Sequence, residues 1–364
     1  MKKEKNIIPL FFSVDDNYAK LLTISLHSII KNASTKYHYE VIVLNTGLNE
    51  KSISLIKSLE NNKFSISFVN VCENLDRISS ELLTRDYYTK TTYYRLFIAS
   101  LFPQFDKILY LDSDTIINGD ISELYRTDIG SNLVGAIPDA SVQIVPEFIE
   151  YVEKALGIKH EDYFNAGILL MNLKKMRDID FEEHFIDLLK KYKFEVAQDQ
   201  DYLNVLCHGD VYFIDESWNT MPLGEKIENP NLIHFNLTFK PWKYDDIMYE
   251  EYFYQNVKEI SLEKDILEMK ASFKEEMKRI DLLGGEKIKE LCLKEANDEK
   301  NYYHLFVEDV HINIIKKIVT CSTTYRSGGF SLKDSTESSL NELTGNVLAF
   351  NISSPLFRIL ILAL

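Results

Sequence analysis

Residues 107–120 read KILYLDSDTIINGD, and this stretch decides the fold class. The apolar run ILYL is typical of a strand buried on both faces, and it leads directly into Asp112 and Asp114. In α/β sheets, ligands bind beyond the carboxyl ends of the strands. Two carboxylates at such an end can converge on Mg²⁺ or Mn²⁺, although aspartates in an ordinary turn fit this pair equally well.

Strand-like and helix-like segments alternate on both sides of this stretch. Strands are predicted at 7–14, 39–45, 64–71, 107–112, 133–137 and 165–173. Helices are predicted at 17–31, 48–60 and 91–102. This order predicts an α/β fold with a mostly parallel sheet flanked by helices.

The composition excludes some classes of function. The chain has 364 residues, 45% of them hydrophobic, and its 41 basic and 56 acidic residues give a net charge of −15. Nonspecific nucleic-acid binding requires a basic surface, so we expect no nucleic-acid partner. An acidic protein that handles a phosphorylated substrate needs a metal or local cations at its site.

Cysteine spacing and hydropathy predict a cytoplasmic protein. The four cysteines have no CxxC pair, which indicates free thiols in a reducing compartment; they are Cys72, Cys207, Cys292 and Cys321. The opening MKKEKNIIPLFFSVDD has a short apolar part followed by two aspartates, so it predicts a first strand rather than a signal peptide. No apolar run approaches the ~20 residues of a membrane span.

The composition shifts near residue 257, which predicts a catalytic domain over 1–257 and a mainly helical extension over 258–364. Apolar side chains recur every three or four residues there and predict one amphipathic helix over 262–280; they are Leu262, Ile266, Met269, Phe273, Met277 and Ile280. This helix could cover its own domain, form a homo-oligomer or lie on a membrane. The terminal PLFRILILAL could dip into the inner face of a bilayer, as a peripheral contact.

A histidine and a lysine stand close together in LIHFNLTFKPW (232–242). The imidazole of His234 could be a third ligand for Mn²⁺, and the ammonium of Lys240 could bind a phosphate. Taken alone, His234 is more typical of a core histidine.

Two other segments place amides and acids beside apolar runs. In YFNAGILLMNL (163–173), Asn165 begins a strand, where its amide can bond sugar hydroxyls. In QDQDYLN (198–204), acidic residues open a helix, where at least one of them complements the helix dipole. The others stay free to bind hydroxyls.

Six segments together, in this order, resemble the family 8 glycosyltransferases. They are SVDDNY (13–18), TTYYRL (91–96), ILYLDSDTII (108–117), YFNAGILLMNL, QDQDYLN and IHFNLTFKPW (233–242). That family includes bacterial lipopolysaccharide galactosyl- and glucosyltransferases and the glycogenins. The resemblance implies a GT-A fold with a Rossmann-like nucleotide-sugar-binding sheet, a UDP-sugar donor, Mn²⁺, and transfer with retention of anomeric configuration.

The resemblance also implies a role for individual residues. The metal ligands would be Asp112, Asp114 and His234. The uridine would be met by Asp15 and Asn17, beside Ser13. The sugar and phosphates of the donor would be met by Arg95, Asp139, Asn165, Asp199, Gln200 and Lys240. Catalytic roles would fall to Arg95, Asp199 and Gln200.

One position departs from the family pattern. The family usually has a glycine three residues after the histidine, with its backbone N–H on a phosphate, and this chain has Leu237 there. Leucine keeps the N–H but reaches positive φ only at a cost. We therefore expect closure of this loop over the diphosphate to differ.

The expected reaction transfers galactose or glucose from a UDP-sugar to a glycan, glycolipid or glycoprotein acceptor. Negative charge develops on the leaving diphosphate, where Mn²⁺ (or Mg²⁺), Lys240 and Arg95 can stabilise it. A retaining enzyme needs either a carboxylate nucleophile or attack from the face that the leaving group departs. The family position holds the amide Gln200, which favours the second route.

Three alternatives fit parts of the sequence. A phosphatase of the haloacid dehalogenase type also has a D-x-D after a strand, but near the chain start and followed by Gly-Thr. A non-catalytic sugar-nucleotide-binding module would be expected to lose the metal ligands, and all three are present. Self-glucosylation of the glycogenin kind needs an accessible tyrosine, and the 21 tyrosines leave it open.

Overall fold

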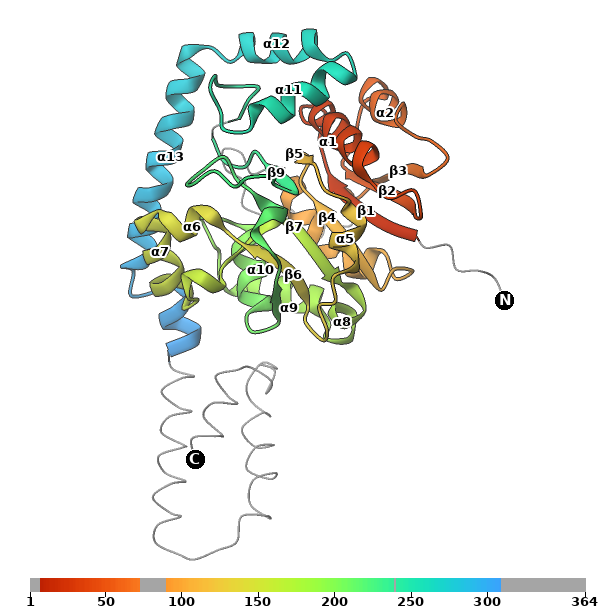
Figure 1. The fold of residues 1–364 in the computed structure, drawn as a ribbon. Helices are drawn as coiled ribbons and strands as arrows, with labels where there is room; N and C mark the ends of the chain where they lie inside the picture. The colour runs from red at the N-terminus through yellow and green to blue at the C-terminus, as the bar shows by residue number, and fades with distance from the viewer. Residues whose placement is uncertain (1–6, 73–89, 239, 309–364) are drawn as a thin grey trace, which may run out of the picture.

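The computed structural model describes residues 7–72, 90–238 and 240–308. A central sheet has the strand order β3-β2-β1-β4-β7-β6-β8 (Figure 1). Its strands are β1 (Ile7–Ser13), β2 (His38–Asn45), β3 (Phe64–Asn70), β4 (Lys107–Leu111), β6 (Val134–Pro138), β7 (Phe164–Asn172) and β8 (Val211–Phe213). Strand β7 runs antiparallel to β4 and β6, and the other pairs are parallel. The predicted α/β fold with a mostly parallel sheet is confirmed.

A second, two-stranded sheet lies beside the carboxyl end of β4. Strand β5 (Thr115–Ile117) pairs antiparallel with β9 (Leu232–His234), and Thr115 stands opposite His234. Three residues, Asp112–Asp114, separate β4 from β5, and the chain turns there. This pairing joins segments that are far apart in the sequence.

Helices cover both faces of the central sheet. In the first half of the chain they are α1 (Ala19–Asn32), α2 (Glu50–Lys57), the 3₁₀ segment η1 (Lys90–Phe97), α4 (Ile98–Leu101), α5 (Ile121–Arg126), α6 (Ala140–Ile144), α7 (Pro146–Tyr151), the π-helical η2 (Val152–Leu156) and the 3₁₀ turn η3 (His160–Asp162). The helical stretch predicted over 91–102 is present, as the 3₁₀ segment η1 followed by the single α-helical turn α4. Its side chains from Tyr93 to Ala99 are all buried.

The remaining helices follow β7. They are α8 (Leu173–Asp178), α9 (Phe181–Lys191), α10 (Asp199–Cys207), the 3₁₀ turn η4 (Glu216–Asn219), α11 (Glu250–Glu259), α12 (Glu263–Ser272), α13 (Glu275–Ala296) and the π-helical η5 (Tyr303–Glu308). Residue alternation in β1 shows how the two layers form. Leu10 and Phe12 pack with α1 and α5, whereas Phe11 packs on the opposite face, where α9 and α10 lie.

The C-terminal helices pack beside α1 and then run down past α6 and α7 (Figure 1). The prediction of one amphipathic helix over 262–280 was wrong, because the chain breaks between α12 and α13 at Phe273 and Lys274. Ile266 is fully buried, but Met277 and Ile280 are 48% and 59% exposed. Helix α11 runs across residue 257, so the proposed boundary between the two domains falls within a helix.

Among the described residues, no helix combines the length and the apolar character needed to cross a bilayer. Cys72, Cys207 and Cys292 are free thiols, as expected from their spacing. Cys321 and the terminal segment 353–364 lie outside the described residues, so the expected membrane contact is a proposal only.

Candidate active site

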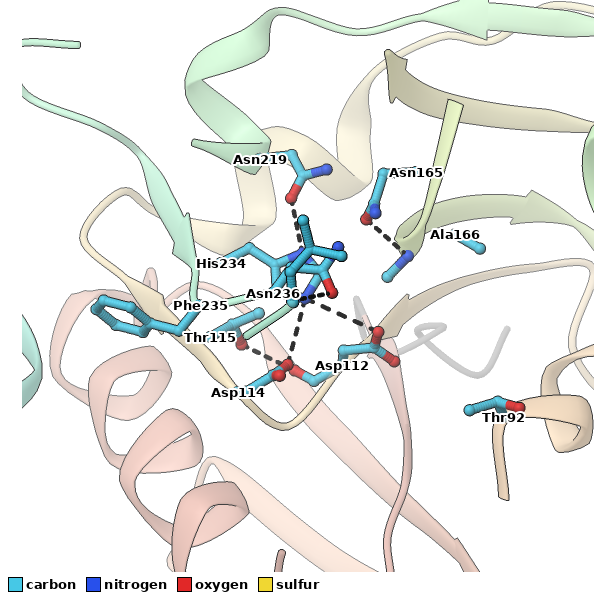
Figure 2. Close-up of polar contacts among 12 residues, drawn as sticks. Thr92, Asp112, Asp114, Thr115, Asn165, Ala166, Asn219, His234, Phe235 and Asn236 are labelled. Atoms are coloured by element: carbon cyan, nitrogen blue, oxygen red, sulfur yellow. Dashed lines mark hydrogen bonds and ion pairs between the residues drawn. The ribbon is translucent and has the colours of Figure 1, made fainter. Parts of the chain in front are cut away.

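The turn after β4 and the end of β9 bring two carboxylates and an imidazole together. Nε2 of His234 lies 3.2 Å from Oδ1 of Asp114 and 3.9 Å from Oδ2 of Asp112. One ligand atom from each residue lies within 4.8 Å of the others. Figure 2 shows His234 between these carboxylates and Asn219. The three predicted metal ligands therefore form one cluster, which we call the Asp–Asp–His triad.

The tautomer of His234 suits a metal ligand. Its Nδ1 lies 2.9 Å from Oδ1 of Asn219, so Nδ1 carries the proton and donates it. The buried Nε2 then presents a lone pair toward the carboxylates and has no hydrogen-bond partner among the described residues. An unpartnered buried acceptor beside two carboxylates fits a divalent cation, and N and O ligands suit Mn²⁺ or Mg²⁺.

The lack of a side chain at Gly167 of β7 leaves space for the triad. A Cβ at this position would lie 2.4 Å from Cε1 of His234 and 2.7 Å from Oδ2 of Asp112. Sequence reasoning missed both Gly167 and Asn219. A glycine inside an apolar strand marks a close approach of other groups, so the sequence pattern could have indicated Gly167. No pattern in the sequence indicates Asn219.

Lys240 lies against the triad with its ammonium in a buried position. Its Nζ forms an ion pair with Oδ2 of Asp114 and donates to the backbone oxygen of Phe235 at 2.9 Å. Burial opposes the charge of both groups. For Asp114, burial raises the pKa, but the neighbouring ammonium of Lys240 acts in the opposite direction, and the pKa lies below its usual value. Burial likewise lowers the pKa of Lys240, and Asp114 raises it above the usual value.

Arg95 connects the triad to the start of α10. Its guanidinium lies 3.1 Å from Oδ1 of Asp112 and 3.2 Å from Oδ2 of Asp199, and it stacks on the ring of Tyr110 at 4.5 Å. Burial raises the pKa of Asp199 to about 6, although Arg95 acts in the opposite direction. Arg95 therefore restrains the orientation of the Asp112 carboxylate.

Three of the predicted sugar-pocket residues form one hydrogen-bonded network. Nε2 of Gln200 and Nδ2 of Asn165 both donate to Oδ2 of Asp139 at 3.0 Å. Oε1 of Gln200 accepts from the backbone N–H of Ala166 at 2.9 Å. These contacts hold both ends of the Gln200 amide. A held amide of this kind can orient hydroxyl groups but is a poor nucleophile.

The residues expected to meet uridine lie after β1, which is the neighbour of β4 in the sheet. Oδ1 of Asp15 accepts from the backbone N–H groups of Asn17 and Tyr18, at 3.0 and 3.1 Å. Asp15 thereby closes a turn of the Asx type. The half-buried Ser13 ends β1 just before it, and Asn17 is exposed.

Leu237 adopts the backbone conformation that favours glycine. Its φ is +61°, in the left-handed region, and its N–H donates to Oδ1 of Asn236 at 2.7 Å. Leucine was expected to reach positive φ only at a cost, and Leu237 nevertheless adopts this conformation. Left-handed φ costs a non-glycine residue roughly 1–2 kcal/mol.

The carboxylate of Asp201 bonds residues behind the candidate sugar pocket and does not face the pocket. Its buried carboxylate accepts from the hydroxyls of Tyr163 and Tyr151 at 2.7 and 2.9 Å, and from the backbone N–H of Ala197 at 2.8 Å. Burial raises the pKa of Asp201 to about 6, while these hydrogen bonds act against the rise. Its oxygens are therefore not free to bind sugar hydroxyls.

This raised pKa makes stability depend on pH. The folded state binds the Asp201 proton more tightly than the unfolded state, whose pKa is near 3.8. Its contribution, about 3 kcal/mol, is fully present below pH ~4 and is lost as the pH rises through ~6. Urea unfolding from pH 4 to 8 should show this dependence for the wild type and a flatter one for Asp201→Asn. The exposed Asp187→Asn is the control, and parallel curves for all three proteins would contradict the assignment.

Solved structures share this fold. The galactosyltransferase LgtC, solved with donor and acceptor sugar analogs, matches with a TM-score of 0.60 and 27% identity, over 69% of this chain and 96% of LgtC. An apo structure of the bifunctional glycosyltransferase WbbM matches with a TM-score of 0.64 and 26% identity, over 74% of this chain and 53% of WbbM. The fold and the site thus define a glycosyltransferase with the GT-A fold.

The chain belongs to glycosyl transferase family 8, whose model matches residues 9–246. A curated relative is the lipopolysaccharide 1,2-glucosyltransferase of Escherichia coli (strain K12). It is 27% identical over 258 residues, which are 64% of this chain and 71% of the relative. The resemblance of the six sequence segments to this family is confirmed.

Proposed function

We propose that this protein is a retaining hexosyltransferase that moves galactose or glucose from a UDP-sugar to a glycan, glycolipid or glycoprotein acceptor. The observation that carries the proposal is the Asp–Asp–His triad with its unpartnered Nε2. The triad lies beside the hydrogen-bonded network of Asp139, Asn165 and Gln200. A diphosphate at the triad would place the sugar against this network. The names of the relatives support transfer of a hexose.

We assign each group a role from its contacts. Asp112, Asp114 and His234 would hold Mn²⁺ or Mg²⁺, which when bound would supply positive charge to the leaving diphosphate. The ammonium of Lys240 would turn from Asp114 to a phosphate oxygen. Arg95 would hold Asp112 in its ligating orientation.

The sugar pocket would orient the donor for front-face attack. Asp139, Asn165 and Gln200 would bond its hydroxyls, and the buried Asp199 would stabilise the positive charge that develops on the sugar. The acceptor hydroxyl would attack from the side of the leaving group and give its proton to the leaving phosphate oxygen. Asp15 and Asn17 would position the uridine.

A screen of UDP-sugars tests this proposal. Incubation with Mn²⁺ and no acceptor should release UDP slowly from one or two of the donors. The anomeric configuration of a transferred sugar, read by NMR, should match that of the donor. Absence of UDP release and of UDP binding would overturn the proposal. Mass added to the protein itself would indicate a self-glucosylating enzyme instead.

Replacing Lys240 by alanine should weaken UDP binding by roughly 1.5–3 kcal/mol, the value of a charge-assisted contact. Calorimetry with UDP and Mn²⁺ measures this loss. The ammonium of Lys240 occupies one oxygen of the proposed metal ligand Asp114. Its removal should therefore not weaken binding of Mn²⁺ in the absence of nucleotide. The two measurements separate phosphate binding from metal binding. The exposed Lys226→Ala is the control. Unchanged UDP affinity would place the phosphate site elsewhere.

The free thiols fit a reducing compartment, so we propose a cytoplasmic location. We retain contact of the C-terminus with the inner face of a membrane, and homo-oligomerisation, as proposals.

A further inference from the structure

The turn that follows Lys240 lies between the candidate active site and the C-terminal helices. Lys240 contacts Asp114 at the site. The backbone N–H groups of Lys243 and Tyr244 donate back to the carbonyl oxygen of Lys240, at 2.8 and 2.9 Å. The turn Lys240–Tyr244 is therefore a closed unit. Any group that holds Lys243 and Tyr244 also restrains the backbone from which the Lys240 side chain extends.

Asp281 of α13 holds both of those residues. Its Oδ2 accepts from the hydroxyl of Tyr244 at 2.9 Å, and its Oδ1 lies 3.4 Å from Nζ of Lys243. Asp281 is only 8% exposed. A carboxylate this buried is costly unless it is paired and hydrogen-bonded, and here the turn supplies a hydrogen bond and an ion pair.

Phe273, at the break between α12 and α13, supports the same two residues. Its ring packs edge-on against the ring of Tyr244, with centroids 5.6 Å apart. Nζ of Lys243 lies 4.8 Å from the centroid of the Phe273 ring. The break in the predicted helix thus places an aromatic ring beneath the turn.

Further contacts bind the two ends of this region to the helices. The hydroxyl of Tyr254 in α11 donates to the carbonyl oxygen of Pro241 at 2.8 Å. Lys270 of α12 forms an ion pair with Asp245 at 2.7 Å. Contacts from three successive helices therefore converge on a segment of six residues.

Helix α13 is itself anchored at its other end. Cys292 is fully buried, and Ile288 and Leu291 pack against the core that contains α7. Helix α13 therefore runs from α7 to the Lys240–Tyr244 turn, along the side of the molecule (Figure 1). Because α13 is fixed at both ends, it can restrain the position of the Lys240–Tyr244 turn. It also lies beyond the family-matched region 9–246.

We propose that Asp281 is a positioning residue for the donor site, and that α12 and α13 are part of the machinery that binds the nucleoside diphosphate. Asp281 holds the Lys240–Tyr244 turn so that the ammonium of Lys240 is presented to the diphosphate. The inference rests on the proposed function, because it requires that Lys240 binds a phosphate. It gives the C-terminal helices a role in donor binding that the family-matched region does not supply.

Calorimetry with UDP and Mn²⁺ tests the inference on Asp281→Asn in the full chain. We expect UDP affinity to fall about three- to tenfold, because Asp281 acts on the phosphate contact of Lys240 indirectly, through the turn. Mn²⁺ affinity in the absence of UDP should be unchanged. The KM of the donor should rise by a similar factor, with a smaller change in kcat. Asp210→Asn is the matched control, because it breaks a partly buried ion pair with Lys175, outside the C-terminal helices and the turn.

Tyr244→Phe provides a milder second variant, since it removes only the hydroxyl that bonds Asp281. Its effect on UDP affinity should not add to that of Asp281→Asn in the double variant, because both break one connection. UDP affinity equal to wild type in both single variants would overturn the inference and reduce Asp281 to a structural role. A wild-type protein that binds no UDP would overturn the proposed function and this inference with it.

Discussion

Asp114→Asn should reduce sugar transfer at least about a thousandfold, because it removes a charged ligand from the Asp–Asp–His triad. The structure adds a second effect that the sequence does not reveal. Asp114 is also the ionic partner of the buried Lys240, and breaking a buried ion pair costs about 3–5 kcal/mol of stability. UDP release gives the first effect and the melting temperature gives the second.

Asp112→Asn helps to separate these two effects. Asp112 takes part in the triad but contacts Arg95 rather than Lys240, and its side chain is 29% exposed. It should lose activity to a similar degree with a smaller loss of stability. Asp106→Asn, at the opposite end of β4, is a control for the strand, since the Asp106 side chain is 77% exposed. Full activity of the wild type in excess EDTA would contradict the metal assignment.

Gly167→Ala should greatly weaken metal binding even though it adds only one methyl group. The new Cβ would overlap Cε1 of His234 at 2.4 Å and a carboxylate oxygen of Asp112 at 2.7 Å. One of these ligands must move, and displacement of a ligand should lower Mn²⁺ affinity at least about a hundredfold. Mn²⁺ titration followed by electron paramagnetic resonance measures this loss directly.

Gly135→Ala is the matched control for crowding in the same sheet. A Cβ at Gly135 would lie 2.7 Å from Cγ2 of Ile129, in an apolar region without triad residues. It should cost about 1–3 kcal/mol of stability through overpacking, while the folded fraction keeps its Mn²⁺ affinity. Equal Mn²⁺ affinity in Gly167→Ala and in the wild type would show that the triad is not the metal site.

Local patterns in the sequence were sufficient for six of the seven strands of the central sheet and for the residue types of the candidate site, whereas the edge strand β8 was not predicted. An apolar run specifies a buried strand through its own side chains, so each of the six predicted strands ends within one residue of the observed one. The two aspartates at the end of such a run indicate a site for the same reason. Neighbours along the chain carry this information.

The motif resemblance singled out His234 as a candidate ligand and the candidate pocket residues, but not what surrounds them. Asp114 and Lys240 are 126 positions apart in the sequence, and the partners Asn219 and Gly167 come from other segments again. Nothing local to these residues specifies those contacts. They arise when β5 pairs with β9 and β7 inserts beside β4.

The C-terminal helices show most clearly what the tertiary structure decided. Residues 262–280 have a helical period throughout, which determines that they are helical but not that they form one helix. The chain breaks at Phe273, whose ring packs against Tyr244, and α13 then places Asp281 under the turn that carries Lys240. Periodicity depends only on spacing along one segment. The break and the burial of Asp281 depend on a surface that another segment provides, so only the folded chain determines them.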